Sequence, residues 1–162
     1  MNYWLISDTR FKHTRLERLG GRSGDWQEKL WRGLERIPAD DVLIHLGDVC
    51  VGDDEAVNRR INSMAARSKV LVLGNHDNMT KQWYHDLGWD FVCDGFELLY
   101  MRHSLWLSHR PQPPMGHFTQ NIHGHTHGNL HRAEEHAAYY ARPTTRTSAR
   151  SSWGSSRSGW IR

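Results

Sequence analysis

Apolar and polar residues come in blocks over the first half of this chain. Largely apolar runs lie at residues 3–7, 42–46 and 70–73, and a polar loop follows each run. Strands with such continuous apolar character are typical of a sheet that is buried on both faces. The pattern therefore predicts neighbouring strands that alternate with helices, as in α/β proteins.

Three segments between and after these strands have the spacing of amphipathic helices. The first begins after the candidate N-cap Asp25 and ends before Pro38, and the second opens at Asp53 or Asp54. The third is short and covers residues 80–87. The positions expected to face the core are Trp26, Leu30, Trp31, Leu34 and Ile37 in the first helix and Ala56, Val57, Ile61 and Met64 in the second.

The second half of the chain has a different pattern. Short strands are predicted at residues 91–93, 96–101 and 105–108, and the turns between them are brief. Close spacing of this kind predicts antiparallel hairpins. An α/β half joined to a more antiparallel half indicates one fold class, α/β with two packed mixed β-sheets flanked by helices.

Carboxylate, amide and imidazole side chains follow the predicted strands in a fixed order. The carboxyl ends of strands in an α/β sheet share a crevice, so these separate residues can converge there. A mixed nitrogen and oxygen set suits Mn, Fe, Zn, Co or Ni better than Ca or an all-oxygen Mg site. The candidate metal ligands are Asp8, Asp48, Asn75, His109, His125 and His127.

The two histidines of Gly124-His125-Thr126-His127-Gly128 are two residues apart. On an extended segment this spacing places both imidazoles on the same face, about 6.5–7 Å apart along the backbone. Such a pair can reach two metal ions that are about 3.5–4 Å apart. The motif therefore favours a two-metal site.

These motifs together resemble the calcineurin-like metallophosphoesterase superfamily, in particular its small bacterial and phage members. The family pattern is D-x-H, GD, GNH with D or E, a lone H and GHxH, and the resemblance covers about residues 3–140. It implies a four-layer sandwich of two mixed sheets with helices outside. It also implies a dinuclear transition-metal site that hydrolyses phosphomonoesters or phosphodiesters.

The resemblance assigns the candidate ligands to two metal positions that share one carboxylate. The first ion would be held by Asp8, Asp48 and His127, and the second by Asp48, Asn75, His109 and His125.

The resemblance and local chemistry also indicate catalytic and substrate-binding residues. His76 is the candidate for protonating the leaving group or clamping a phosphoryl oxygen, with Asp77 orienting its ring. Arg110, beside His109, is a candidate phosphate contact through bidentate hydrogen bonds. His13 is a candidate group on the substrate side of the cleft.

The first motif departs from the family pattern at two positions. Arg10 stands where the family has a ligand histidine, and Lys12 stands where it has a glycine. Arginine stays protonated in proteins and cannot serve as an ordinary metal ligand. Its charge would repel cations unless Asp8 pairs with it, so we expect a weakened first metal site and an intact second one. Three outcomes follow: an enzyme with one strong metal, replacement by His13 as a ligand, or an inactive descendant that binds a phospho-ligand or a protein.

The net charge of +3 belongs to the end of the chain rather than to its body. Residues 142–162 contain five arginines and no acidic residue, which leaves 16 of the 21 basic residues against 18 acidic ones. The folded body therefore gives no indication of a nucleic-acid-binding face, although the tail arginines leave nucleic-acid binding as a third hypothesis. We expect a metallophosphoesterase domain at residues 1–141 and a disordered Arg/Ser-rich tail at 142–162. Family members continue with at least one more core strand, so the last strand is expected to be missing.

The remaining features favour a cytoplasmic protein with no membrane association. The two cysteines are too few for a disulfide framework, and no apolar run approaches the ~20 residues needed to cross a bilayer. The first residues lack the basic leader of a signal peptide. The expected partner is a phosphate-ester substrate.

Overall fold

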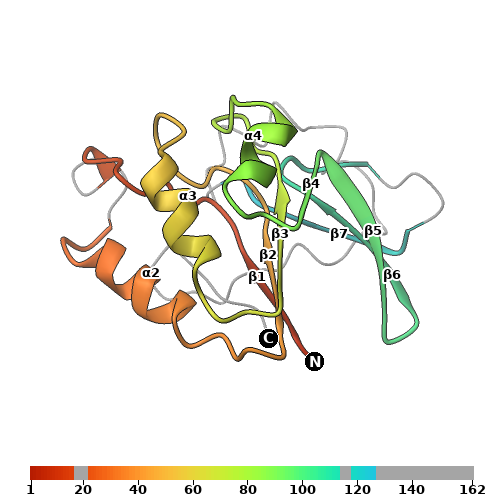
Figure 1. Cartoon of the computed structure of the whole chain (residues 1–162). Helices are drawn as coiled ribbons and strands as arrows, with labels where there is room; N and C mark the ends of the chain where they lie inside the picture. Colours follow the sequence, from red (N-terminus) through yellow and green to blue (C-terminus); the bar gives the residue numbers. More distant parts are fainter. Residues whose placement is uncertain (17–21, 114–117, 127–162) are drawn as a thin grey trace.

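A parallel sheet forms the centre of the computed structural model, which describes residues 1–16, 22–113 and 118–126 (Figure 1). The expectations for His127 and for the 142–162 tail lie outside these residues. Neighbouring strands of this sheet follow one another in the chain, in the order β1-β2-β3-β4, and all pairs are parallel. The strands are β1 (Tyr3–Ile6), β2 (Val42–His45), β3 (Ser68–Val72) and β4 (Phe91–Cys93).

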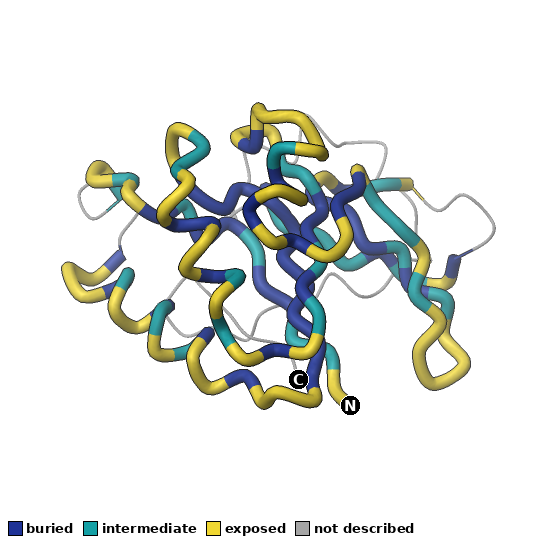
Figure 2. Tube along the Cα trace, viewed as in Figure 1, coloured by how far each residue is buried: buried dark blue, intermediate teal, exposed yellow. Residues whose placement is uncertain are grey.

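Helices cover one face of this sheet: α2 (Trp26–Leu34), α3 (Glu55–Asn62) and α4 (Lys81–Asp86). Because right-handed crossovers that step in one direction leave their helices on the same side, this strand order explains the one-sided helical layer. Alternate strand residues such as Leu43 and Leu71 pack against the buried side of the helices. Figure 2 shows the central strands buried and the outer helix faces exposed.

A second sheet packs against the other face. It contains β5 (Gly95–Tyr100), β6 (His103–Ser108) and β7 (Gln120–His123), in the order β5-β6-β7. The β5-β6 pair is antiparallel and the β6-β7 pair is parallel. Leu5, Ile44 and Val72 of the first sheet share a buried apolar cluster with Leu105 and Leu107 of the second.

The predicted fold class, two packed sheets flanked by helices, is therefore confirmed. The described residues supply three of the four expected layers, and the expected loss of the last strand concerns residues beyond 126. None of the helices in the described part of the chain is long and apolar enough to cross a bilayer.

The strand at 91–93 is the main correction to the predicted arrangement. We expected it to form an antiparallel hairpin, but β4 pairs in parallel with β3. Helix α4 lies between the two strands, so the chain crosses over and enters β4 in the same direction as β3. Asp94 then carries the chain into the second sheet, where only β5 and β6 form the expected hairpin.

The helix starts differ in how they are capped. Asp54 is the N-cap of α3, and its carboxylate accepts the Val57 N–H at 2.9 Å. Asp25 occupies the N-cap position of α2 without a side-chain cap bond, and its carboxylate lies 2.8 Å from Lys29 Nζ. Ala56, which we expected in the buried stripe of α3, is exposed, and the buried positions of that helix are Val57, Asn58 and Ile61.

Candidate metal centre

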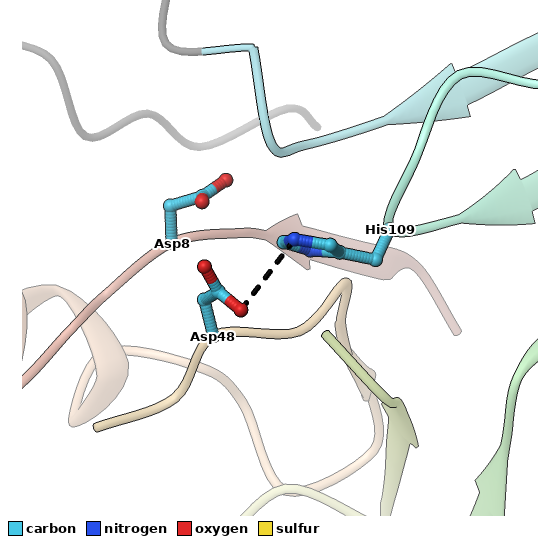
Figure 3. Close-up of side chains that lie close together, drawn as sticks. All are labelled: Asp8, Asp48 and His109. Atoms are coloured by element: carbon cyan, nitrogen blue, oxygen red, sulfur yellow. Dashed lines mark ion pairs between the residues drawn. The ribbon is translucent and has the colours of Figure 1, made fainter. Parts of the chain in front are cut away.

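The loops after β1, β2, β3, β6 and β7 meet at one edge of the molecule. These strands are parallel within each sheet, so their carboxyl ends gather at this edge. The side chains of Asp8, Asp48 and His109 converge there from three loops (Figure 3). Each offers a ligand atom within 4.8 Å of the other two, and all three residues are buried.

Three glycines allow the loops to approach one another so closely. A Cβ on Gly47 would lie 2.5 Å from Gly74 N, and a Cβ on Gly74 would overlap Asp48 Oδ1. A Cβ on Gly124 would lie 2.5 Å from Asp8 Oδ2. Each glycine of the GD, GNH and GHxH motifs therefore provides space for a neighbouring motif.

Several candidate ligands have the left-handed backbone conformation that favours glycine. The φ angles are +54° at Asp8, +58° at Asp48 and +69° at His125. Such conformations cost about 1–3 kcal/mol each and persist where the surrounding structure holds them. Here backbone hydrogen bonds do so, because Asp8 N donates to Gly47 O at 2.9 Å. The strained loops aim the side chains at a common centre.

Three candidate ligands lie close to the imidazole of a fourth, His109. Its Nε2 lies 3.0 Å from Asn75 Oδ1, 3.1 Å from His125 Nδ1 and 3.5 Å from Asp48 Oδ1. When each ligand atom is about 2.1 Å from a metal ion, two neighbouring ligand atoms are about 3.0 Å apart in octahedral coordination and about 3.4 Å apart in tetrahedral coordination. Each of these three distances to His109 Nε2 is one that two ligands of a shared divalent transition-metal ion could have, and the group whose ligand atoms all lie within 4.8 Å of one another is Asp8, Asp48 and His109.

The hydrogen bond from His109 Nδ1 is consistent with a metal-binding role. Its Nδ1 lies 2.7 Å from Leu46 O, a carbonyl that can only accept, so Nδ1 donates its hydrogen there. In the neutral ring the Nε2 atom then carries a lone pair that faces Asn75 and Asp48. Metal-binding histidines characteristically have such a partner on the opposite nitrogen.

At the first candidate metal position, the side chain of Arg10 lies against the carboxylates. Arg10 Nη2 lies 2.6 Å from Asp48 Oδ2 and 3.7 Å from Asp8 Oδ1. The sequence suggested Asp8 as the partner of Arg10, but the arginine contacts Asp48 more closely. Asp8 Oδ2 accepts hydrogen bonds from Ser7 Oγ at 2.5 Å and from His125 N at 2.9 Å.

Asp77 does not orient the ring of His76 as expected. Its carboxylate accepts backbone N–H groups of Gly74, Asp48 and Val49 at 2.7, 2.8 and 3.1 Å, which join the loops after β2 and β3. Burial raises the pKa of Asp77. The His76 side chain is half exposed, with Nε2 4.0 Å from Asp48 Oδ2. The described hydrogen bonds of Asp77 therefore go to backbone groups and not to the imidazole of His76.

The two candidate substrate contacts lie on different loops. His13 is half-buried on the loop that carries Arg10, and its N–H donates to Arg10 O at 3.1 Å. Burial above all, together with the nearby charge of Arg10, lowers the pKa of His13. Arg110 is exposed and directly follows the buried His109.

Arg22 is a positioning residue that sequence reasoning missed. It is buried, and it donates to Asp8 O at 2.7 Å and to Thr9 O at 3.0 Å. Its guanidinium lies 4.5 Å from the ring centroid of Trp26, and burial lowers its pKa to about 10. A single arginine in a polar loop has no sequence signal that separates it from a solvated one.

His45 is the hydrogen-bonded core histidine that the sequence indicated. Its Nδ1 accepts the Gly47 N–H at 3.1 Å, and its Nε2 lies 2.9 Å from Thr9 Oγ1. The Thr9 hydroxyl donates to Val49 O, so Nε2 carries the hydrogen and donates to Thr9. The neutral ring thus joins the first motif to the second.

Acid is expected to destabilise the protein through His45. Burial lowers the pKa of His45 from 6.5 to about 4. Between these values the unfolded chain binds a proton that the folded chain excludes, so the free energy of unfolding falls as the pH decreases through this window. The loss approaches about 3 kcal/mol below pH 4. In urea titrations at pH 7 and 4.5, His45→Gln should show a smaller difference between the two conditions than the parent chain. An equal difference would contradict this assignment.

Comparisons with known proteins extend the description of the fold. No protein-family model and no curated protein matches this chain. The chain is similar to AQ665 from Aquifex aeolicus, a protein of unknown function, with a TM-score of 0.62 and 23% identity over 77% of this chain and 79% of that chain. A novel archaeal phosphodiesterase matches with a TM-score of 0.45 and 16% identity, over 75% of this chain and 70% of that chain.

Nuclease MPE from Pseudomonas putida also matches, with a TM-score of 0.45 and 22% identity over 77% of this chain and 61% of that chain. The likeness to the Aquifex protein shows a shared fold. Fold and site together define an α/β protein of two packed sheets with a candidate metal centre at one edge.

Proposed function

We propose that this chain is a calcineurin-like metallophosphoesterase that hydrolyses phosphomonoesters or phosphodiesters. The observation that carries the proposal is the convergence of Asp48, Asn75 and His125 on the lone pair of His109 Nε2. These distances to His109 are ones that ligands of a shared transition-metal ion could have, Asp8, Asp48 and His109 also offer ligand atoms within 4.8 Å of one another, and the backbone carbonyl of Leu46 fixes the tautomer of His109 that binds a metal.

The proposed centre has the two metal positions that the family resemblance assigns, and the two are expected to differ in metal affinity. The second position has the complete set formed by Asp48, Asn75, His109 and His125, whereas Arg10 weakens the first. Metal ions at such a centre lower the pKa of bound water and neutralise charge on the phosphoryl oxygens. The mixed nitrogen and oxygen set suits Mn, Fe, Zn, Co or Ni, and manganese is our first choice for assays.

The protein's own groups would act around this centre. His76, exposed and 4.0 Å from Asp48, is the proposed group that protonates the leaving oxygen or clamps a phosphoryl oxygen. Asp77 would act through the backbone of the two loops that it joins. Arg110 and His13 would contact the phosphate ester from either side of the metal ligands. We place this activity in a cytoplasmic domain of residues 1–141.

The proposal is tested by removing the central ligand. We expect His109→Ala to lower Mn²⁺ affinity and hydrolysis of bis(p-nitrophenyl) phosphate and p-nitrophenyl phosphate by more than about 100-fold, since even outer-shell partners of metal ligands are worth 10–100-fold. Metal affinity is measured by isothermal titration calorimetry and hydrolysis by p-nitrophenolate release.

His103→Ala is the matched control, because His103 is exposed at the start of the same strand, β6. It should retain parental metal affinity and hydrolysis. If His109→Ala retained both as well, the proposed centre would be wrong.

The contact between Arg10 and Asp48 favours a second candidate function. A guanidinium that is already bound to the shared carboxylate is compatible with a non-catalytic descendant that binds a phosphorylated ligand. This alternative predicts no Mn²⁺-dependent turnover in the parent chain or in Arg10→His, together with retained binding of inorganic phosphate.

A further inference from the structure

The position of Arg10 has a consequence beyond a weakened site. Its guanidinium lies beside the two carboxylates that the family resemblance assigns to the first metal ion, with Nη2 2.6 Å from Asp48 Oδ2 and 3.7 Å from Asp8 Oδ1. The Asp48 side chain is fully buried, and that of Arg10 is only 11% exposed. A permanent positive charge thus takes the position expected for a cation.

Asp48 is arranged as a bridge between two different partners. Its Oδ2 contacts Arg10, whereas its Oδ1 lies 3.5 Å from His109 Nε2 and accepts the His76 N–H at 3.0 Å. In a two-metal site the shared carboxylate would contact one ion with each oxygen. Here one oxygen contacts a guanidinium and the other faces the ligand group of the second position.

The backbone around Arg10 keeps the guanidinium in place. Arg10 N donates to Asp48 O at 3.0 Å, and the buried Arg22 holds the carbonyls of Asp8 and Thr9 just before it. Arg10 itself has a φ of +47°. Several buried bonds therefore hold the backbone that carries the Arg10 side chain, and turning the guanidinium outward would break its own bond to Asp48 Oδ2.

A metal ion at the first position would have to displace this arginine. That exchange would leave the guanidinium of Arg10 without its buried partner, so we expect it to lower metal affinity at this position by at least about 100-fold. The ligand group around His109 contains no such competitor among the described residues. One divalent cation per chain is the expected occupancy at concentrations that fill the second position.

Arg10 also retains donors for an anion. A guanidinium has five N–H groups, and only one of its nitrogens, Nη2, donates to a described residue. Its Nε is buried and has no hydrogen-bond partner within residues 1–16, 22–113 and 118–126, so the donors left for an anion are the remaining N–H groups of Nη1 and Nη2. Arginine binds phosphoryl oxygens through such parallel donors.

We propose that Arg10 takes the place of the first metal ion and, together with one divalent cation at the His109 position, holds a phosphoryl oxygen of the ligand. This inference rests on the proposed function and adds which positive groups, one arginine and one metal ion, contact the phosphoryl group. Its metal-binding part rests on the ligand group and does not require turnover.

The first test is the metal stoichiometry of the full chain, measured by isothermal titration calorimetry with Mn²⁺. We expect one high-affinity site in the parent chain and a second site in Arg10→His, where a neutral imidazole can ligate. Arg36→His is the control, because Arg36 is exposed beyond the end of α2, and it should bind one equivalent. Two sites of similar affinity in the parent chain, or one site in a folded Arg10→His variant, would overturn the proposal.

The second test titrates inorganic phosphate into protein that carries Mn²⁺ only at the high-affinity site. Arg10→Gln should weaken phosphate binding by at least about tenfold, since it removes a charge-assisted contact. Arg10→Lys, which keeps the charge, should still bind one Mn²⁺. Unchanged phosphate affinity in Arg10→Gln would refute the anion-binding part.

These outcomes separate the inference from the proposed function. Absence of hydrolysis with one Mn²⁺ per chain would end the proposed function and leave the role of Arg10 intact. Hydrolysis by a parent chain that binds two Mn²⁺ ions with equal affinity would support the proposed function and overturn the role inferred for Arg10.

Discussion

Asp48→Asn is expected to abolish hydrolysis and Mn²⁺ binding, with a loss of more than about 100-fold in each, and to destabilise the fold by about 3 kcal/mol. The side chain is fully buried, and its two oxygens accept from different groups, Arg10 Nη2 and His76 N. An amide has one oxygen, so its NH₂ group must face either the guanidinium or the backbone N–H. Either orientation places two donors together and removes the charge that balances Arg10.

The effect is measured by Mn²⁺ titration, p-nitrophenolate release and urea unfolding of the purified variant. Asp40→Asn is the control, because Asp40 is exposed in the turn before β2 and the same chemical change there should be neutral. Parental Mn²⁺ affinity in Asp48→Asn would show that this carboxylate is not shared with the metal position.

The second large effect is expected for Gly124→Ala. An added Cβ would lie 2.5 Å from Asp8 Oδ2, 2.8 Å from Ser7 Cβ and closer still to Ser7 Oγ. Ser7 cannot move freely, because its hydroxyl bonds to Asp8 Oδ2 and Leu46 O at 2.5 and 3.2 Å. We expect a loss of at least about 3 kcal/mol in the free energy of unfolding, at the upper end of the overpacking range.

Urea unfolding of Gly124→Ala should be compared with Gly24→Ala, since Gly24 has open space where its Cβ would point. Combining Gly124→Ala with Ser7→Gly removes the closest clash, so the double variant should be more stable than the two single losses predict. If the changes in the free energy of unfolding were simply additive, the steric contact between residues 124 and 7 would be ruled out as the cause.

Hydrophobic periodicity was sufficient to predict most of the fold. The helix stripes and buried strands follow from local spacing, and the observed clusters on both faces of the parallel sheet contain most of those positions, the exposed Ala56 being an exception. The error at 91–93 has a physical cause, because a three-residue apolar run does not record which neighbour it will pair with. The direction of the crossover through α4 decided that pairing.

The motifs also indicated which side chains should meet, and the structure brings Asp8, Asp48 and His109 together from loops far apart in the chain. It could not be predicted that Asp77 would bind three backbone N–H groups rather than the ring of His76. Nor did any pattern reveal the buried Arg22 behind the first loop. These contacts depend on loop approach, which local sequence does not encode.

Residue types and their spacing were enough to establish the layered α/β architecture, the order of the polar clusters and the presence of an arginine where the family resemblance expects a histidine. Those properties depend on residue type and on spacing within one segment. The contact of Arg10 with Asp48 at 2.6 Å and the hydrogen bond of His109 Nδ1 to Leu46 O could be learned only from the three-dimensional structure. Both results require groups separated by dozens of residues to meet, and only the packing of the two sheets fixes their distance.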